Sequence, residues 1–216
     1  QFVKPLGSHR VYWDASNQIA ASASPPSSAG SREVFDSFYL YALSGADPLR
    51  QRVAFALSEI FVISMLDGNV SGNPRGVASY LDTLGANAFG NYRDLLQAVA
   101  LHPMMGLYLT YLKNQKEDPA KGRIPDQNFA RESMQLFSIG LFQLNADGSV
   151  KTGPDGKGLE TYTGDDVSGL SKVFTGFSWS GPDTSDSRFQ GGGSPSDPNR
   201  DWMPMQAYAK YHSTSE

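Results

Sequence analysis

The feature that most constrains the fold is an apolar run from Val53 to Leu66, which only two serines and one glutamate interrupt. Because a helix must have about 20 apolar residues to cross a bilayer, this run of 14 residues is too short to span a membrane. Asp47 stands where a helix N-cap is expected, and Pro48 follows at the first helical position. A helix over 48–66 would be apolar on nearly all sides, so we predict that it lies buried at the centre of the fold.

Capping residues, glycines and prolines divide much of the remaining chain into further helices. Pro103 interrupts one of them at His102, because proline cannot continue the hydrogen-bond ladder of a helix. The chain is therefore predicted to be mainly α, a bundle-like domain of about seven or eight helices packed around the 48–66 helix. The other predicted helices cover residues 32–43, 74–84, 91–101, 104–112, 126–139 and 163–175.

The pattern changes after the helix that ends at Ile139. Asn145–Gly148 and Gly153–Gly156 are typical tight-turn sequences, and residues 159–163 alternate between apolar and polar side chains. These signals predict a small β-hairpin or meander insertion near 141–163.

We predict a single domain in three parts. Residues 1–30 form an irregular N-terminal segment, because residues 21–30 are a low-complexity stretch of small residues and proline. Residues 31–177 form the helical core with the β excursion. Residues 178–216, much of which is rich in Gly, Pro, Ser and Asp, form a long loop and a terminal segment.

The composition narrows the range of functions. The formal net charge is -4 and the Lys and Arg residues are scattered, so the chain lacks the clustered positive charge of a nucleic-acid-binding protein. There is no cysteine, which excludes disulfides and thiolate metal sites. The many Gly, Ser, Thr, Asn and Tyr residues favour an exported protein, although the sequence shows no signal peptide or membrane span.

Three long stretches carry a family resemblance. They are Leu49–Ser64, Asn87–Gly106 and Pro125–Leu141, and the last is followed by Tyr162–Val167 and Phe174–Gly176. Together, and in this order, they resemble the DUF1800 family of exported bacterial proteins. The resemblance implies that this chain is an interior piece of a longer protein. It also implies an extracytoplasmic location, periplasmic or secreted, and a second exported protein of the DUF1501 type as a partner. It implies no activity, because none is assigned to the family.

One position departs from the family pattern. Members commonly have Glu and then Asn-Tyr before Ala-Arg-Glu, whereas this chain has Gln127, Asn128 and Phe129 there. If the family glutamate were a metal ligand or a base, this protein would lack it.

The predicted 126–139 helix holds the sharpest candidate site. Asn128, Arg131, Glu132 and Gln135 recur at helical spacing and form one polar face. Glu132 beside Arg131 could act in proton transfer, and the amides of Asn128 and Gln135 could bind a polar ligand. A solvated face, or an ion pair that holds the helix in place, is the more ordinary interpretation.

Glu59 lies within the long apolar run, and burial of a lone carboxylate is costly. We therefore predict that Glu59 is at least partly buried and forms a structural ion pair with an arginine of another helix. Arg93 and Arg131 are the candidates, and we select Arg93.

His102 stands at the helix break and is a candidate general base or ligand. Its more ordinary role would be hydrogen bonding to backbone carbonyls that the break leaves free. The sequence contains no His-x-x-x-His, Glu-x-x-His or His-x-His spacing of a helical zinc site, and the Asp-Gly turns lack the closing glutamate of a calcium loop, so we predict no metal site.

Two functional hypotheses remain open. The first is a non-enzymatic exported protein that binds or assembles with another exported protein. The second is an extracytoplasmic hydrolase, or another enzyme that acts on a polymer, with Glu132, Arg131 and His102 around one cleft. The sequence indicates no cofactor.

Overall fold

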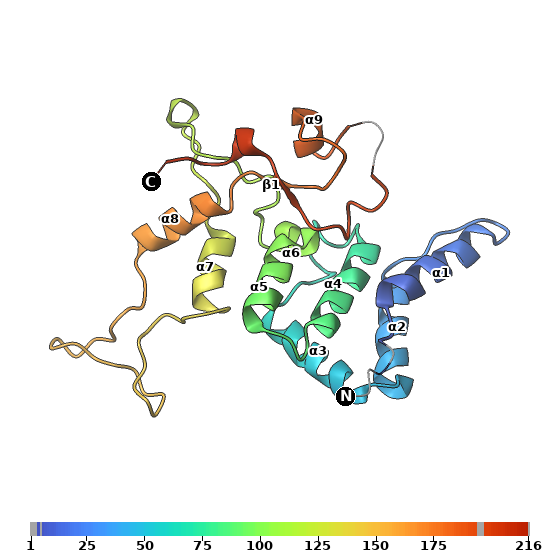
Figure 1. Cartoon of the computed structure of the whole chain (residues 1–216), viewed down its shortest axis with the longest axis horizontal. Coiled ribbons are helices and arrows are strands. Elements are labelled where there is room, and N and C mark those ends of the chain that lie inside the picture. Colours follow the sequence, from blue (N-terminus) through green and yellow to red (C-terminus); the bar gives the residue numbers. More distant parts are fainter. Residues whose placement is uncertain (1–3, 5, 194–196, 216) are drawn as a thin grey trace. The chain divides into compact units, whose positions relative to one another are not determined.

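The computed structural model describes residues 4, 6–193 and 197–215. Over these residues the chain is mainly α, with nine α-helices, two short 3₁₀ helices and a single two-stranded antiparallel sheet (Figure 1), which confirms the predicted fold class. The chain forms two compact units, where we had expected one domain. Unit 1 contains Gln1–Tyr108, Trp179–Gly181 and Pro195–Met205, and unit 2 contains Leu109–Ser178, Pro182–Ser194 and Gln206–Glu216.

Unit 1 is built around helix α4, which packs against α1, α2, α3, α5 and α6. Seven of the 13 residues of α4 are buried, and the side chains of Val77, Tyr80 and Leu84 are at most 5% exposed. The helices are α1 (His9–Ala21), α2 (Ser31–Ser44), α3 (Pro48–Ile60), α4 (Pro74–Ala86), α5 (Tyr92–Leu101) and α6 (Pro103–Tyr108). The predicted break at His102 separates α5 from α6, as proline requires.

Helix α3 corrects the prediction of a central buried helix. It ends at Ile60 rather than at residue 66, and none of its residues is buried. Phe61 leaves the helical conformation with its ring fully buried, and its carbonyl oxygen accepts a hydrogen bond of 2.7 Å from the Tyr80 hydroxyl. That bond satisfies a carbonyl at the end of the helix and fixes where α3 stops.

Helix α1 corrects the prediction that residues 1–30 are irregular. The Asp82 carboxylate of α4 accepts hydrogen bonds from the Ser8 hydroxyl and from the His9 and Arg10 amides, at 2.7, 2.7 and 3.1 Å. These bonds satisfy free N–H groups at the start of α1 and place a negative charge there, which suits the helix dipole. The stabilising group is more than 70 residues away in the sequence, so local patterning could not show it.

Unit 2 has a small aromatic core and short elements. Phe129 stacks on Tyr111 at a centroid distance of 4.1 Å and meets Phe174 edge to face at 4.7 Å. The helices are η1 (Pro119–Lys121, 3₁₀), α7 (Asn128–Gln135), α8 (Gly164–Val173), α9 (Asp186–Phe189) and η2 (Ala209–Tyr211, 3₁₀). Strands β1 (Phe177–Ser178) and β2 (Gln206–Ala207) pair Phe177 with Ala207 and Ser178 with Gln206. The predicted long loop over 178–216 therefore contains β2 and two short helical turns.

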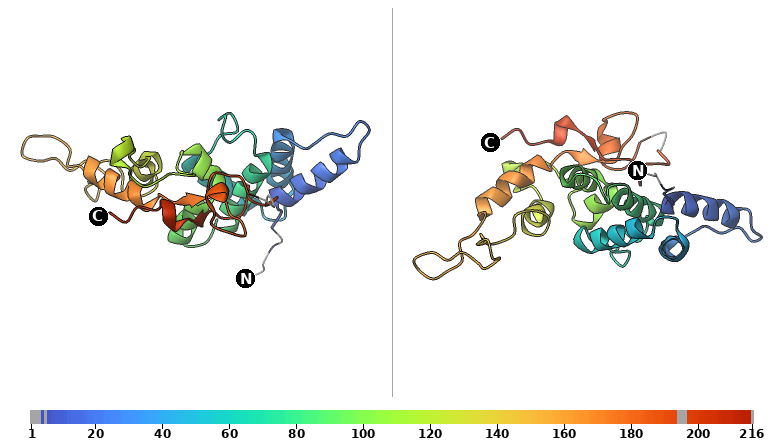
Figure 2. Two further views of the ribbon diagram at one scale, coloured as in Figure 1. Left: turned by 90° about the horizontal axis from the view of Figure 1, so that it is seen from above. Right: turned by 60° about the horizontal axis from the view of Figure 1, so that its bottom comes forward.

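The predicted β excursion is present as an arm, residues 141–163, that projects from α7 and α8 (Figures 1 and 2). It contains isolated bridges rather than regular strands. Three backbone hydrogen bonds of 2.8–2.9 Å form a closed ring. The amide of Gln143 donates to the carbonyl of Leu159, the amide of Leu159 to the carbonyl of Lys151, and the amide of Lys151 to the carbonyl of Gln143. The three residues are eight positions apart, so three successive segments of the arm hold one another in place.

Candidate functional site

The polar residues of α7 are largely open to solvent. Asn128 and Arg131 are exposed, whereas Glu132 and Gln135 are half-buried. Within residues 4, 6–193 and 197–215, the side chains of Glu132 and Arg131 form no ion pair, and neither one hydrogen bonds to another residue. His102 belongs to unit 1, whereas α7 belongs to unit 2. A catalytic set of these residues therefore stays a prediction.

Arg131 does line a pocket at the base of the arm. This pocket, about 220 Å³ in volume, is also lined by Phe142, Glu160 and Tyr162. The Tyr162 hydroxyl is buried and has no hydrogen-bond partner among the described residues. Tyr162 opens one of the motifs that carry the family resemblance, but nothing in that motif singles out its hydroxyl as a binding group.

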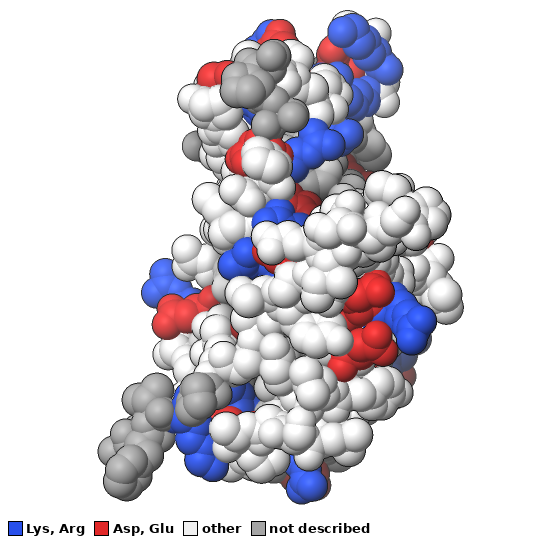
Figure 3. Space-filling model, turned by 90° about the vertical axis from the view of Figure 1, so that its right-hand side faces the viewer, with Lys and Arg blue, Asp and Glu red and all other residues white. Residues whose placement is uncertain are grey.

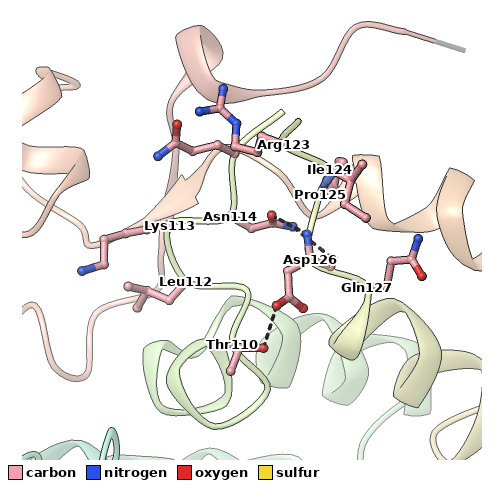
Figure 4. Close-up of a pocket in the computed structure, with 10 residues that line it drawn as sticks. Thr110, Leu112, Lys113, Asn114, Arg123, Ile124, Pro125, Asp126 and Gln127 are labelled. Atoms are coloured by element: carbon pink, nitrogen blue, oxygen red, sulfur yellow. Dashed lines mark hydrogen bonds between the residues drawn. The ribbon is translucent and has the colours of Figure 1, made fainter. Parts of the chain in front are cut away.

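A larger polar pocket, about 570 Å³ in volume, precedes α7 (Figure 4). The Asn114 side chain holds the backbone of Asp126 at both ends, because Oδ1 accepts from the Asp126 amide at 2.8 Å and Nδ2 donates to its carbonyl at 3.3 Å. The Asp126 carboxylate accepts from the Thr110 hydroxyl at 3.0 Å and from the Asn128 amide at 2.8 Å. These bonds fix the entry into α7, which begins at Asn128 rather than at the predicted residue 126.

Two non-glycine residues of this pocket have left-handed backbone conformations. Thr110 has φ of 62° and Lys113 has φ of 70°, conformations that cost about 1–3 kcal/mol each and tend to cluster at functional sites. Helix α6 ends at Tyr108 rather than at Leu112, because a residue with the positive φ of Thr110 cannot continue a right-handed helix. Lys113 is held by a 2.9 Å hydrogen bond from its amide to the Phe177 carbonyl.

The remaining lining groups give this pocket its chemistry. They include the cations Lys113 and Arg123 and the amides Gln115 and Gln127. Such a surface can donate hydrogen bonds to a carboxylate or another polar group. The sequence showed only a polar loop at this place, because the bonds that assemble the pocket join residues 12 and 16 positions apart.

His102 is buried in unit 1, and it contacts the backbone at the helix break. Its Nδ1 accepts a hydrogen bond of 3.2 Å from the Met104 amide, so the proton of the neutral ring is assigned to Nε2. We had predicted a bond to a free carbonyl, but the partner is an amide. Its ring meets Tyr80 edge to face at 5.1 Å.

Burial lowers the pKa of His102 to about 3. The ring is therefore neutral near neutral pH and a weak base. It lines a pocket of about 350 Å³ together with Asp94, Gln97 and Trp202. This environment suits a hydrogen-bond donor better than a general base.

The predicted structural ion pair between Glu59 and Arg93 is wrong. Both side chains are exposed, and among the described residues neither forms an ion pair. The reason is the orientation of α3, which turns Glu59 towards water. A hydrated carboxylate has no desolvation cost, so no buried cation has to compensate for it.

The structure also bears on three further features: metal sites, membrane spans and basic surfaces. The described part of the chain contains no group of three or more His, Asp or Glu residues placed to hold a metal ion. It also contains no helix that is long and apolar enough to cross a membrane. On the face in Figure 3, blue Lys and Arg side chains alternate with red Asp and Glu rather than forming one basic stripe.

These features define a mainly helical protein with polar pockets and an exposed arm. The chain belongs to the family described as "Protein of unknown function (DUF1800)", whose sequence model matches residues 7–210. This match confirms the resemblance and extends it over nearly the whole chain, helix α1 included. No solved structure matches the chain.

Proposed function

We propose that this chain is an exported binding protein that assembles with a second exported protein, of the DUF1501 type, through the arm. The single observation that carries the proposal is the exposure of the arm's apolar side chains. Leu144 is 56% exposed, and Val150, Phe142 and Leu159 are 44%, 40% and 40% exposed. Exposed apolar groups that gather on one element are typical of protein-binding surfaces.

The arm presents these side chains on a preorganised backbone. A Cβ at Gly158 would lie 2.8 Å from Phe142 Cδ1 and 3.1 Å from Val150 Cγ1, so both side chains pack closely over this glycine and leave no room for a larger residue. The ring of backbone hydrogen bonds holds the segments that carry them. A partner that binds there therefore has little backbone order to impose, which favours affinity.

The family resemblance supports the choice of partner and the location. The many small polar residues and the lack of cysteine are compatible with export. No observation on α7 or at His102 favours the hydrolase hypothesis over this one.

Isothermal titration calorimetry between the purified chain and a DUF1501-type protein encoded beside it tests the proposal. We expect Val150→Glu to weaken binding at least tenfold, because it places a charge in the apolar centre of the surface. Lys157→Glu is the matched control, since it adds the same side chain at an exposed tip of the same arm. We expect its affinity to stay within about threefold of the parent.

Hydrogen exchange at the amides of Gln143, Lys151 and Leu159 shows whether the arm remains closed in each variant. Loss of binding with protected amides supports the proposal. A parent chain that does not bind such a protein, or a Val150→Glu variant that binds normally, refutes it.

A further inference from the structure

Unit 1 carries a separate apolar surface on the outward side of α3. All of its members are exposed and recur at i, i+3, i+6, i+7, i+10 and i+11, which is one side of a helix. Helix α3 packs against α2 and α4, and the ring of Phe55 lies 6.0 Å from the ring of Phe38 in α2, centroid to centroid. We call this surface the α3 face, and it consists of Leu49, Arg52, Phe55, Ala56, Glu59 and Ile60.

The α3 face is apolar apart from one cation and one anion. Leu49, Phe55 and Ile60 are 62%, 51% and 46% exposed. Arg52 and Glu59 have no ion-pair partner in the described part of the chain. They stand seven residues apart, which is about 10.5 Å along a helix and nearly two full turns. The midpoint between them falls between Phe55 and Ala56.

We propose that two copies of this chain associate through the α3 face, with their α3 helices antiparallel about a twofold axis at that midpoint. Twofold symmetry then places Arg52 opposite Glu59 of the partner subunit, and Glu59 opposite Arg52 of the partner subunit. Two identical ion pairs form across the axis. A parallel pair would place like charges opposite each other, so the charges select the antiparallel arrangement.

The apolar residues fit the same arrangement. Ala56 lies beside the axis and is small enough for two helices to approach to about 8–10 Å, the usual separation of packed helices. Phe55 lies on the other side of the axis and would pack against Ala56 of the partner subunit. Leu49 and Ile60 extend the contact towards both ends. One helix pair is a small interface, so we expect a dissociation constant on the order of micromolar.

Sedimentation equilibrium of the full chain over a range of concentrations tests the proposal, with charge variants of both positions. We expect the parent chain to form dimers. Arg52→Glu alone and Glu59→Arg alone should each weaken association at least tenfold, because each places two pairs of like charges across the axis. The double variant Arg52→Glu/Glu59→Arg should recover the parent affinity within about threefold, because it restores both ion pairs with their polarity reversed.

Mixing the two single variants gives a sharper readout. Arg52→Glu carries two acids on the α3 face and Glu59→Arg carries two bases, so an equimolar mixture should form a heterodimer that neither forms alone. The matched control is Arg93→Glu, which makes the same charge change at an exposed position of α5. We expect it to dimerise like the parent.

The proposal is overturned by a parent chain that stays monomeric at about one hundred times the expected dissociation constant. It is also overturned by single variants that associate normally, or by a double variant and a mixture that both fail to recover. All three positions changed are exposed, and tryptophan fluorescence checks that each variant is folded, because all three tryptophans lie in unit 1. The arm lies in unit 2, so this proposal and the proposed function can fail separately.

Discussion

Helices α3 and α4 have 13 residues each and both begin with proline, but their environments are opposite. None of the residues of α3 is buried, whereas α4 has seven buried residues and contacts five other helices of unit 1. The longest apolar run in the sequence begins within α3, not α4. An apolar stretch of sequence indicates that a helix has an apolar surface. Whether other residues of the same chain bury that surface depends on how the neighbouring helices pack.

The largest effect that separates the two helices is expected from truncating a leucine of α4. Leu84 is fully buried, so Leu84→Ala removes apolar contacts and leaves a cavity. We expect a loss of about 2–5 kcal/mol in the free energy of unfolding of unit 1. Urea denaturation followed by tryptophan fluorescence measures this loss, because all three tryptophans report on unit 1. A loss below about 1 kcal/mol would mean that α4 is not the centre of the unit.

Acid should be the next largest perturbation, and it acts on the α4 side because His102 packs against Tyr80. Burial lowers the pKa of His102 from its ordinary 6.5 to about 3. Between these values the unfolded chain binds more protons than the native chain, so stability is lost as pH falls below 6.5. The slope is about 1.4 kcal/mol per pH unit, which gives about 2–3 kcal/mol between pH 6.5 and 4.5.

His102→Asn is the variant that isolates this effect. The asparagine oxygen can still accept the Met104 amide, but the side chain does not titrate. Urea denaturation at several pH values should give a flatter slope for the variant. Burial also lowers the pKa of His9, so a smaller acid sensitivity should remain. Parallel slopes in parent and variant would show that His102 is not the group responsible.

A third, smaller effect is expected where α4 holds α1. Asp82→Ala removes the carboxylate that accepts bonds from the Ser8 hydroxyl and from the His9 and Arg10 amides. We expect a loss of about 2 kcal/mol, because free amides at a helix start lose a charged acceptor. Hydrogen exchange over α1 and urea denaturation measure it. Asp94→Ala is the control, since that exposed carboxylate makes no comparable cap. Equal losses in both variants would show that Asp82 does not anchor α1.

The features that the sequence predicted well are those with a local cause. Proline at 103 dictates the break between α5 and α6, and the turns with Gly148 and Gly156 require their positive φ values of 84° and 77°. The capping box at Thr163 likewise marks the start of α8, because Thr163 and Asp166 satisfy each other's backbone amides.

The features that could not be predicted from the sequence depend on hydrogen bonds between residues that are far apart in the sequence. Helix α1 requires Asp82, and the pocket before α7 requires the bonds between Asn114 and Asp126. The orientation of α3 could not be predicted from the sequence for a related reason. Apolar side chains lie on several sides of this helix, so the periodicity of the sequence does not indicate which side faces α4. The end of the helix depends on the hydrogen bond from the Tyr80 hydroxyl to the Phe61 carbonyl, which the sequence does not reveal.

The smallest effect is expected from the same truncation on α3. Leu49 is 62% exposed, whereas Leu84 is fully buried, so Leu49→Ala removes few contacts and leaves no cavity. We expect a change of at most about 0.5 kcal/mol in the free energy of unfolding, measured at concentrations where the chain is monomeric. Because the two variants make an identical chemical change in helices of equal length, their difference isolates burial. A loss at Leu49 close to that at Leu84 would show that α3 is buried after all, and the proposed pairing of α3 helices would then have no surface to use. A loss that appears only as the concentration is raised would instead report that pairing, because only an interface residue couples stability to association.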